Sequence, residues 1–426
     1  MTEIAVLGFG VVGSGVVEVL DKNAAMITQN AGQAVRVKYI LDVRDFPGSP
    51  YENLLIKDFA TILDDANISV VVEVIGGTGV ALEFTRRSLE AGKSVVTSNK
   101  ELVATHGYEL IKLAREKGVN YLFEASVGGG IPVVRPLAQC MAANRISEIY
   151  GILNGTTNYI LSEMAKNGAG FSDALLDAQK KGYAEADPTA DIEGYDACRK
   201  ICILSSLAFG RHVYPDQVPT TGITGVTTDD MRFADELGYK IKLLSRSRKI
   251  GDKVAAYVAP HLVSKDNLLA GVDGVMNGVV IRGNAVGNVT FCGAGAGKMP
   301  TASAVVADVI DSVKHQYARK WIDWAEGSAD LTADPMQLES AWYVRTSADR
   351  EKVRREFGEV VFAGGAVSTG EATSIGEAGS AGDMASADGA GPVTAFKSAV
   401  MSGRIIRELL GRGIPALSLF RVLGDY

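Results

Sequence analysis

Acidic and basic residues are concentrated in the stretch from Lys181 to Lys200. Carboxylates such as those of Glu185, Asp191 and Asp196 accept hydrogen bonds and could hold an ammonium group. A lysine can donate or accept a proton at a carbonyl or hydroxyl oxygen when burial and neighbouring charges tune its pKa. Together these residue types predict a pocket for an amino-acid substrate that carries a reacting oxygen.

The local pattern places Asp196 and Lys200 on one face of a helix. Proline and glycine predict an ordered loop over residues 182–194. From Tyr195 to Phe209 the apolar residues recur with helical spacing, which puts the two charged residues one turn apart. An exposed pair of this kind would contribute only roughly a few tenths of a kcal/mol. Because this helix is apolar nearly all round, we expect it to be buried and its pair to be functional.

A glycine-rich turn with the spacing Gly-x-Gly-x-x-Gly directly follows the apolar strand Ile4–Leu7. Gly8 permits a tight turn, Gly10 lets the backbone approach a pyrophosphate, and Gly13 lets the next helix pack against the strand. The start of that helix favours an anion. We therefore predict a dinucleotide site rather than a purely structural turn. Its candidate contacts are Gly8, Gly10, Val11, Val12 and Gly13.

Two charged residues after the next predicted strand could contact the ribose of the dinucleotide. Asp42 could accept a hydrogen bond from a 2′-hydroxyl group and favour NAD. Arg44 could instead pair with a 2′-phosphate and favour NADP. Both could also be ordinary solvated charges at a strand end. We favour NADP, with Arg44 as the cofactor contact.

A lysine follows a later strand, in the run Thr97-Ser98-Asn99-Lys100. In open α/β sheets, ligands bind beyond the carboxyl ends of the strands. A lysine at such an end is often merely solvated. Here it lies where the nicotinamide and the substrate would meet, so we expect Ser98 to contact the cofactor and Lys100 to contact both ligands.

Three consecutive glycines follow Glu124 at another predicted strand end. One carboxylate and several backbone carbonyl groups would suit a hard monovalent or divalent cation. On composition alone, a plain flexible turn explains the glycines at least as well.

The apolar pattern predicts three domains that would position these residues. Residues 1–135 alternate strands with helices, which predicts a dinucleotide-binding, doubly wound parallel sheet of the Rossmann type. Residues 136–318 predict a substrate-binding α+β domain, and residues 340–426 a small α+β domain with a mobile loop near residues 363–391. The strands expected in the first domain are Ile4–Leu7, Val35–Leu41, Val70–Ile75, Ser94–Thr97 and Asn120–Glu124, and the helices are Gly13–Leu20, Ala81–Ala91 and Tyr108–Lys117.

Composition and charge exclude several classes of protein. The 426 residues are 47% hydrophobic and carry a net charge of -7. This acidic balance argues against nucleic acid and anionic membranes as partners. Four dispersed cysteines form no disulfide framework, and neither a signal peptide nor a transmembrane span is evident. We expect a cytoplasmic protein that acts on a small molecule.

Six segments, in order along residues 2–314, resemble the homoserine dehydrogenase family. The longest is Ala178-x3-Gly182-Tyr-Ala-x2-Asp187-Pro-x2-Asp191-Ile-x-Gly194-x-Asp196-x3-Lys200, which matches the family signature at every fixed position. The others are residues 8–13, 97–100, 124–129, 154–158 (Asn-Gly-Thr-Thr-Asn) and 293–301. Members of the family reduce aspartate 4-semialdehyde to homoserine with NAD(P)H and catalyse the reverse reaction.

The resemblance implies roles for the charged residues. Lys200 would donate the proton to the carbonyl oxygen, and Lys100 would lie near both the nicotinamide and the substrate. Glu185 and Asp196 would bind the amino acid, with Asp191 close by. How the two lysines divide the proton transfer stays open.

The resemblance also implies further ligands and an assembly. Gly182 and Gly295 would touch the cofactor. The family binds a monovalent cation, sodium or potassium, and forms homodimers through the sheet of the middle domain. The implied cation ligands are Glu124, Val127, Gly129 and Ile131.

The last domain departs from the family pattern. Its strand–helix–strand order resembles a regulatory ACT domain, whose first loop usually reads Asp-x-x-Gly-x-Leu. The corresponding segment, Thr346-Ser-Ala-Asp349-Arg-Glu, lacks that glycine. This difference argues against feedback by threonine through the tail.

Two other functions are compatible with the residues. One is another Rossmann oxidoreductase of an amino acid, such as an aspartate dehydrogenase, which rates with homoserine and aspartate would separate. The other is a non-catalytic, dinucleotide-dependent sensor whose tail contacts a partner. The presence of both Lys100 and Lys200 argues against the sensor.

Overall fold

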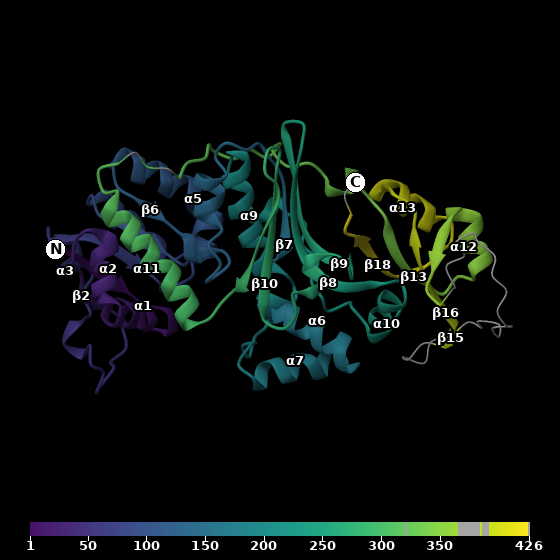
Figure 1. Ribbon diagram of the computed structural model, residues 1–426, viewed down its shortest axis with the longest axis horizontal. Coiled ribbons are helices and arrows are strands. Elements are labelled where there is room, and N and C mark those ends of the chain that lie inside the picture. Colours follow the sequence, from purple (N-terminus) through teal and green to yellow (C-terminus); the bar gives the residue numbers. More distant parts are fainter. Residues whose placement is uncertain (319, 321, 365–383, 386–391, 425–426) are drawn as a thin grey trace.

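The computed structural model describes residues 1–318, 320, 322–364, 384–385 and 392–424. A helix-flanked sheet at the N-terminal end, a central group of long strands and a smaller C-terminal unit follow one another across the molecule (Figure 1). In these residues, no helix combines the length and the apolar character needed to cross a membrane.

The N-terminal sheet is entirely parallel and has the strand order β3-β2-β1-β4-β5-β6. Its strands are β1 (Thr2–Leu7), β2 (Val35–Leu41), β3 (Leu55–Ile56), β4 (Ile68–Glu73), β5 (Ser94–Thr97) and β6 (Tyr121–Leu122). Residues 4–7 are fully buried, as expected for a parallel strand covered on both faces. This order confirms the predicted Rossmann sheet, and ligands bind such a sheet beyond its carboxyl ends.

Six helices pack around this sheet or against its helices. They are α1 (Val11–Lys22), α2 (Ala24–Ala31), α3 (Ala60–Asp64), α4 (Val80–Glu90), α5 (Lys100–Glu116) and, from much later in the chain, α11 (Lys298–Lys314). The last helix packs against α1 and α2, although the sequence analysis assigned residues 298–314 to the middle domain. Gly15 permits this approach, because a Cβ there would lie 3.0 Å from the carbonyl oxygen of Lys298.

The central unit is an antiparallel set of strands with helices on one side. Its strands are β7 (Ile146–Ile152), β8 (Tyr239–Ile250), β9 (Lys253–Ser264), β10 (Met276–Gly283) and β11 (Gly287–Ala294), in the order β11-β10-β7-β8-β9. Its helices are α6 (Gly155–Asn167), α7 (Phe171–Lys180), α8 (Thr189–Ile192), α9 (Tyr195–Phe209) and α10 (Thr228–Glu236). Helix α9 contacts β7, β8 and β9 as well as α5 of the N-terminal unit.

The C-terminal unit continues the central sheet. Its main elements are β13 (Trp342–Thr346), α12 (Arg350–Phe357), β14 (Val360–Phe362), β16 (Pro392–Ser398), α13 (Gly403–Gly411) and β18 (Ala416–Val422), with the short strands β12 (Glu339–Ser340), β15 (Met384–Ala385) and β17 (Met401–Ser402). The sheet order is β18-β13-β16-β14, and β18 pairs in parallel with β9. The mobile loop predicted near residues 363–391 falls largely outside the described residues.

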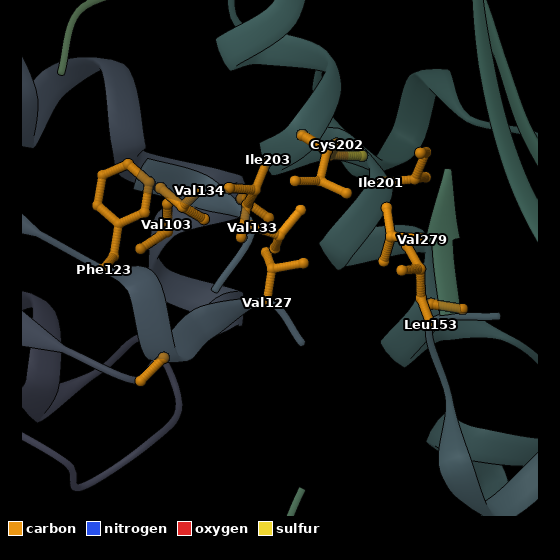
Figure 2. Packing of buried hydrophobic residues seen from close by; sticks show 14 of the residues in the cluster. Val103, Phe123, Val127, Val133, Val134, Leu153, Ile201, Cys202, Ile203 and Val279 are labelled. Carbon is orange, nitrogen blue, oxygen red and sulfur yellow. The ribbon is translucent and has the colours of Figure 1, made fainter. Parts of the chain in front are cut away.

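Apolar side chains of α9 fill the space between the first two units (Figure 2). Ile201, Cys202 and Ile203 are at most 1% exposed and belong to the same core as Val127 and Leu153. This packing confirms the predicted burial of α9. It also restricts the position of Lys200, because the three residues that follow it cannot move without opening the core.

Candidate active site

Asp196 lies between the two lysines that the sequence analysis singled out. Its Oδ1 is 2.6 Å from Nζ of Lys100, and its Oδ2 is 2.6 Å from Nζ of Lys200. Lys100 is the first residue of α5 and follows the carboxyl end of β5 after two intervening residues, whereas Asp196 and Lys200 belong to α9. The structure thus joins charged groups from two units at the edge of the sheet where ligands bind.

A hydrogen-bonded network sets the position of Lys100. The Oδ1 of Asn99 accepts from the backbone N–H of Leu102 and caps α5, while its Nδ2 donates to the carbonyl oxygen of Gly77. Thr97 donates its hydroxyl to the buried carboxylate of Glu73, 2.7 Å away. Sequence reasoning overlooked Glu73, although a carboxylate that ends an otherwise apolar strand was a usable signal.

The two lysines lie in different electrostatic surroundings. Burial lowers the pKa of Lys200, which is 7% exposed and also donates to the carbonyl oxygen of Leu153 at 2.8 Å. The charge of Asp196 raises the pKa of the more exposed Lys100. Burial acts to raise the pKa of Asp196, but the two lysines outweigh it and lower that pKa. Lys200 is therefore the lysine from which a proton is more readily removed.

Asp191 joins this cluster through Asn154. The side-chain Nδ2 of Asn154 donates to Oδ1 of Asp191 at 2.7 Å and to Oδ2 of Asp196 at 2.9 Å. Burial, and next the charge of Asp196, raise the pKa of Asp191. The sequence analysis noted the Asn-Gly-Thr-Thr-Asn segment but gave Asn154 no role. Its place directly after the largely apolar residues 149–153 was the signal.

Two other predicted contacts are exposed and form no hydrogen bond or ion pair with this cluster. The side chain of Glu185 is exposed and forms no hydrogen bond or ion pair with any residue that the structure describes. Gly182 is also exposed, with a φ of 75° that favours glycine. The loop containing both is held to the start of α6 by the Thr156 hydroxyl, which donates to the carbonyl oxygen of Tyr183.

The glycine turn has the shape that a pyrophosphate requires. Gly8 has a φ of 95°, and a Cβ on Gly13 would lie 1.9 Å from the carbonyl oxygen of Gly8. Gly10, the residue before α1, provides no side-chain cap, and Val11 is 68% exposed. The first N–H groups of α1, among them that of Val12, are therefore open to an anionic ligand. These residues fit a dinucleotide.

Asp42 and Arg44 form a bidentate pair beside this turn. Nε and Nη2 of Arg44 donate to Oδ1 and Oδ2 of Asp42 at 3.0 and 2.9 Å. Asp42 also accepts from the backbone N–H groups of Phe9 and Arg44. The carboxylate has thus filled most of its accepting capacity, while the side chain of Arg44 is 60% exposed and has donors to spare.

The predicted cation ligands lie in a buried turn. The carboxylate of Glu124 accepts from the backbone N–H groups of residues 133–135 at 2.6–2.9 Å. In the described chain, the carbonyl oxygens of Val127, Gly129 and Ile131 accept no hydrogen bond, although all three residues are buried. Unpartnered buried carbonyl groups suit a cation. No cluster of three acidic, histidine or cysteine side chains is found among these residues that could hold a metal instead.

Gly295 lies against the same turn. A Cβ on Gly129 would come within 2.5 Å of the carbonyl oxygen of Gly295, and Gly130 donates its N–H to the carbonyl oxygen of Ala294. Ser98 is half-buried and precedes Asn99, the residue that caps α5. The predicted cation and cofactor contacts therefore adjoin where Gly129 meets Gly295.

A Rossmann sheet with an anion-binding glycine turn, next to a buried lysine–carboxylate cluster, defines an NAD(P)-dependent oxidoreductase. Residues 8–124 match the family described as homoserine dehydrogenase, NAD binding domain, and residues 132–310 match the family described as homoserine dehydrogenase. The chain belongs to the homoserine dehydrogenase family.

Relatives and solved structures agree with this assignment. A homoserine dehydrogenase of Neisseria gonorrhoeae is 42% identical over 82% of both chains, and one of Pseudomonas aeruginosa is 45% identical over 73% of this chain and 72% of its own. The crystal structure of a homoserine dehydrogenase from Thiobacillus denitrificans is similar with a TM-score of 0.85 and 35% identity, covering 99% of this chain and 98% of that one.

Proposed function

We propose that this protein catalyses the reversible NAD(P)H-dependent reduction of L-aspartate 4-semialdehyde to L-homoserine, a step in the biosynthesis of threonine and methionine. The observation that carries the proposal is the buried ion pair of Lys200 with Asp196, at the edge of the sheet where the cofactor would bind. Burying two charges costs free energy of desolvation, and a buried ion pair near a ligand site is a candidate for proton transfer.

Lys200 is the proton donor in this proposal. Two of its three N–H groups are used, by Asp196 and by the carbonyl oxygen of Leu153, which leaves one for the substrate oxygen. Burial lowers its pKa and so makes the transfer easier. Lys100 keeps its charge because Asp196 raises its pKa, and it therefore positions the substrate and stabilises negative charge on the reacting oxygen.

Asp191 and Asp196 offer carboxylates to the ammonium group of the amino acid, and Glu185 reaches the substrate only if its exposed loop closes. A bound nicotinamide dinucleotide supplies or accepts the hydride. Its contacts are assigned to Gly8, Gly10, Val11, Val12, Gly13, Arg44, Ser98, Lys100, Gly182 and Gly295. We favour NADP, since Arg44 has free donors and Asp42 has little accepting capacity left.

Three further assignments complete the proposal. Sodium or potassium binds to Glu124 and to the carbonyl groups of Val127, Gly129 and Ile131, whose carbonyl oxygens accept no hydrogen bond in the described chain. The protein acts in the cytoplasm as a homodimer joined through its central sheet. Its domains are residues 1–135, 136–318 and 340–426, with α11 packed on the first. A related hyperthermophilic archaeal homoserine dehydrogenase, 28% identical, is known in complex with NADPH.

The test is oxidation of homoserine, followed at the absorbance band of the reduced nicotinamide, with NAD or NADP and with sodium or potassium. We expect Lys200→Ala to lose at least roughly 100-fold in kcat while it still binds the cofactor. The matched control is Lys181→Ala, which removes an exposed lysine of the same stretch. Wild-type turnover in Lys200→Ala would overturn the proposed role. A faster rate with aspartate than with homoserine would favour an aspartate dehydrogenase.

A further inference from the structure

Asn154 occupies a junction between the end of β7 and the first turn of α6. Its side-chain Oδ1 accepts from the backbone N–H of Thr157 at 2.8 Å and from the hydroxyl of Thr157 at 2.9 Å. A backbone N–H can only donate, so this contact establishes which end of the amide is the oxygen. The Nδ2 of Asn154 must therefore face Asp191 and Asp196.

Both hydrogens of this Nδ2 are committed to carboxylates. One goes to Oδ1 of Asp191 and the other to Oδ2 of Asp196, and Asn154 itself is only 4% exposed. An oxygen that accepts from an amide N–H does not carry a proton pointing at it. The contact thus favours the ionised form of each carboxylate, because an ionised acceptor forms the stronger hydrogen bond. The same Oδ2 of Asp196 also accepts from Lys200 at 2.6 Å.

The charges around Asn154 come from three elements. Lys100 comes from α5, Asp191 from α8, and Asp196 and Lys200 from α9. Two positive and two negative groups balance only while both carboxylates are ionised. Neighbouring carboxylates repel, and burial together with Asp196 favours a proton on Asp191. The hydrogen bond from Asn154 opposes that protonation.

We propose that Asn154 is a positioning residue of the reaction, which holds Asp191 and Asp196 side by side as ionised carboxylates, so that the transferable proton resides on Lys200. The adjacent backbone supports this arrangement, because the carbonyl oxygen of Leu153 accepts from Lys200. One short segment therefore sets both the place of the lysine and the charge of its neighbours. The inference rests on the proposed role of Lys200 as proton donor.

The experiment uses Asn154→Asp, which keeps an oxygen to cap α6, removes both donor hydrogens and adds a third carboxylate. We expect kcat to fall about 10- to 100-fold near neutral pH, as for the loss of hydrogen bonds to charged groups. The acid limb of the kcat/KM profile for homoserine should move to higher pH by about one unit or more. KM for the cofactor should stay unchanged.

A second variant and a control separate this role from folding. Asn154→Ser retains the cap without adding charge, and should lose kcat with a smaller shift of the acid limb. The control is Asn267→Asp, the same change at another helix-capping asparagine, whose Oδ1 accepts from the backbone N–H of Leu269. It should keep the wild-type profile.

Wild-type kcat and an unmoved acid limb in both Asn154 variants would overturn the inference. If Asn154→Asp does not fold, Asn154→Ser alone tests the inference. Its kcat should then fall while its KM for the cofactor stays unchanged. Activity in Lys200→Ala would instead overturn the proposed function itself. An inactive Lys200→Ala together with unaltered Asn154 variants would remove only the role of Asn154.

Discussion

Replacing Arg44 by alanine tests the proposal that this residue favours NADP over NAD. Of the five N–H groups of a guanidinium, two are used on Asp42 and the other three can reach a ligand. Both oxygens of Asp42 already accept two hydrogen bonds each. Arg44 can therefore bind a 2′-phosphate, while Asp42 has little capacity to bind a 2′-hydroxyl group.

The size of the effect follows from these contacts. Hydrogen bonds between charged groups contribute about 1.5–3 kcal/mol each, and the exposure of Arg44 favours the lower end. One lost contact therefore raises KM for NADP by about 10-fold and two by up to about 100-fold. The variant also leaves the charge of Asp42 unpaired, which adds repulsion towards the phosphate. NAD lacks that phosphate, so its KM should change by less than about threefold.

The assay measures KM for NADP and NAD in the wild type, in Arg44→Ala and in Arg36→Ala. The last variant removes the same side chain from the exposed amino end of β2 and should behave as the wild type. The effect on NADP should shrink at high ionic strength, because the salt screens exposed charges. A ratio of the two KM values in Arg44→Ala within about threefold of the wild-type ratio would refute the reasoning.

Two predictions concern stability. Burial lowers the pKa of the fully buried His261 from 6.5 to about 3, so between these values the unfolded chain binds a proton that the folded chain does not. The free energy of unfolding should consequently fall by about 1.4 kcal/mol per pH unit as the pH drops below 6.5. His261→Asn should lack this contribution when unfolding by urea is measured across that pH range. Equal slopes in the wild type and the variant would contradict the lowered pKa of His261. Asp230, which is fully buried, accepts hydrogen bonds from Arg345, Tyr343 and Ser418 and so ties α10 to the C-terminal sheet. Asp230→Ala should lower the free energy of unfolding by about 3–5 kcal/mol, because it leaves Arg345 buried without its carboxylate. The double variant Asp230→Leu/Arg345→Met should lower it by less, and equal losses in the two variants would contradict a buried ion pair.

Several features could be predicted because they depend on neighbours along the chain. The helix Tyr195–Phe209 was predicted with both of its bounds, since its apolar spacing ends at Gly194 and Gly210, whose φ values are 84° and 75°. The i,i+4 pair of Asp196 and Lys200 follows from the helix itself. The glycine turn and β5 could be predicted for the same reason, because both depend on residues that are neighbours in the sequence. In contrast, the predicted helix Tyr108–Lys117 began too late, because polar residues hide the first turns of α5.

The pairings between distant segments were decided only by the tertiary structure. Residue spacing gives the face of a helix on which a side chain lies, but not the partner which that face meets. The contact of Lys100 with Asp196 depends on how α5 packs against α9, and the role inferred for Asn154 depends on how β7 ends beside them. The sequence by itself therefore determined the chemical groups and their local spacing. The tertiary structure decided which of those groups lie close enough to interact, because electrostatic coupling acts over distances in space rather than along the chain.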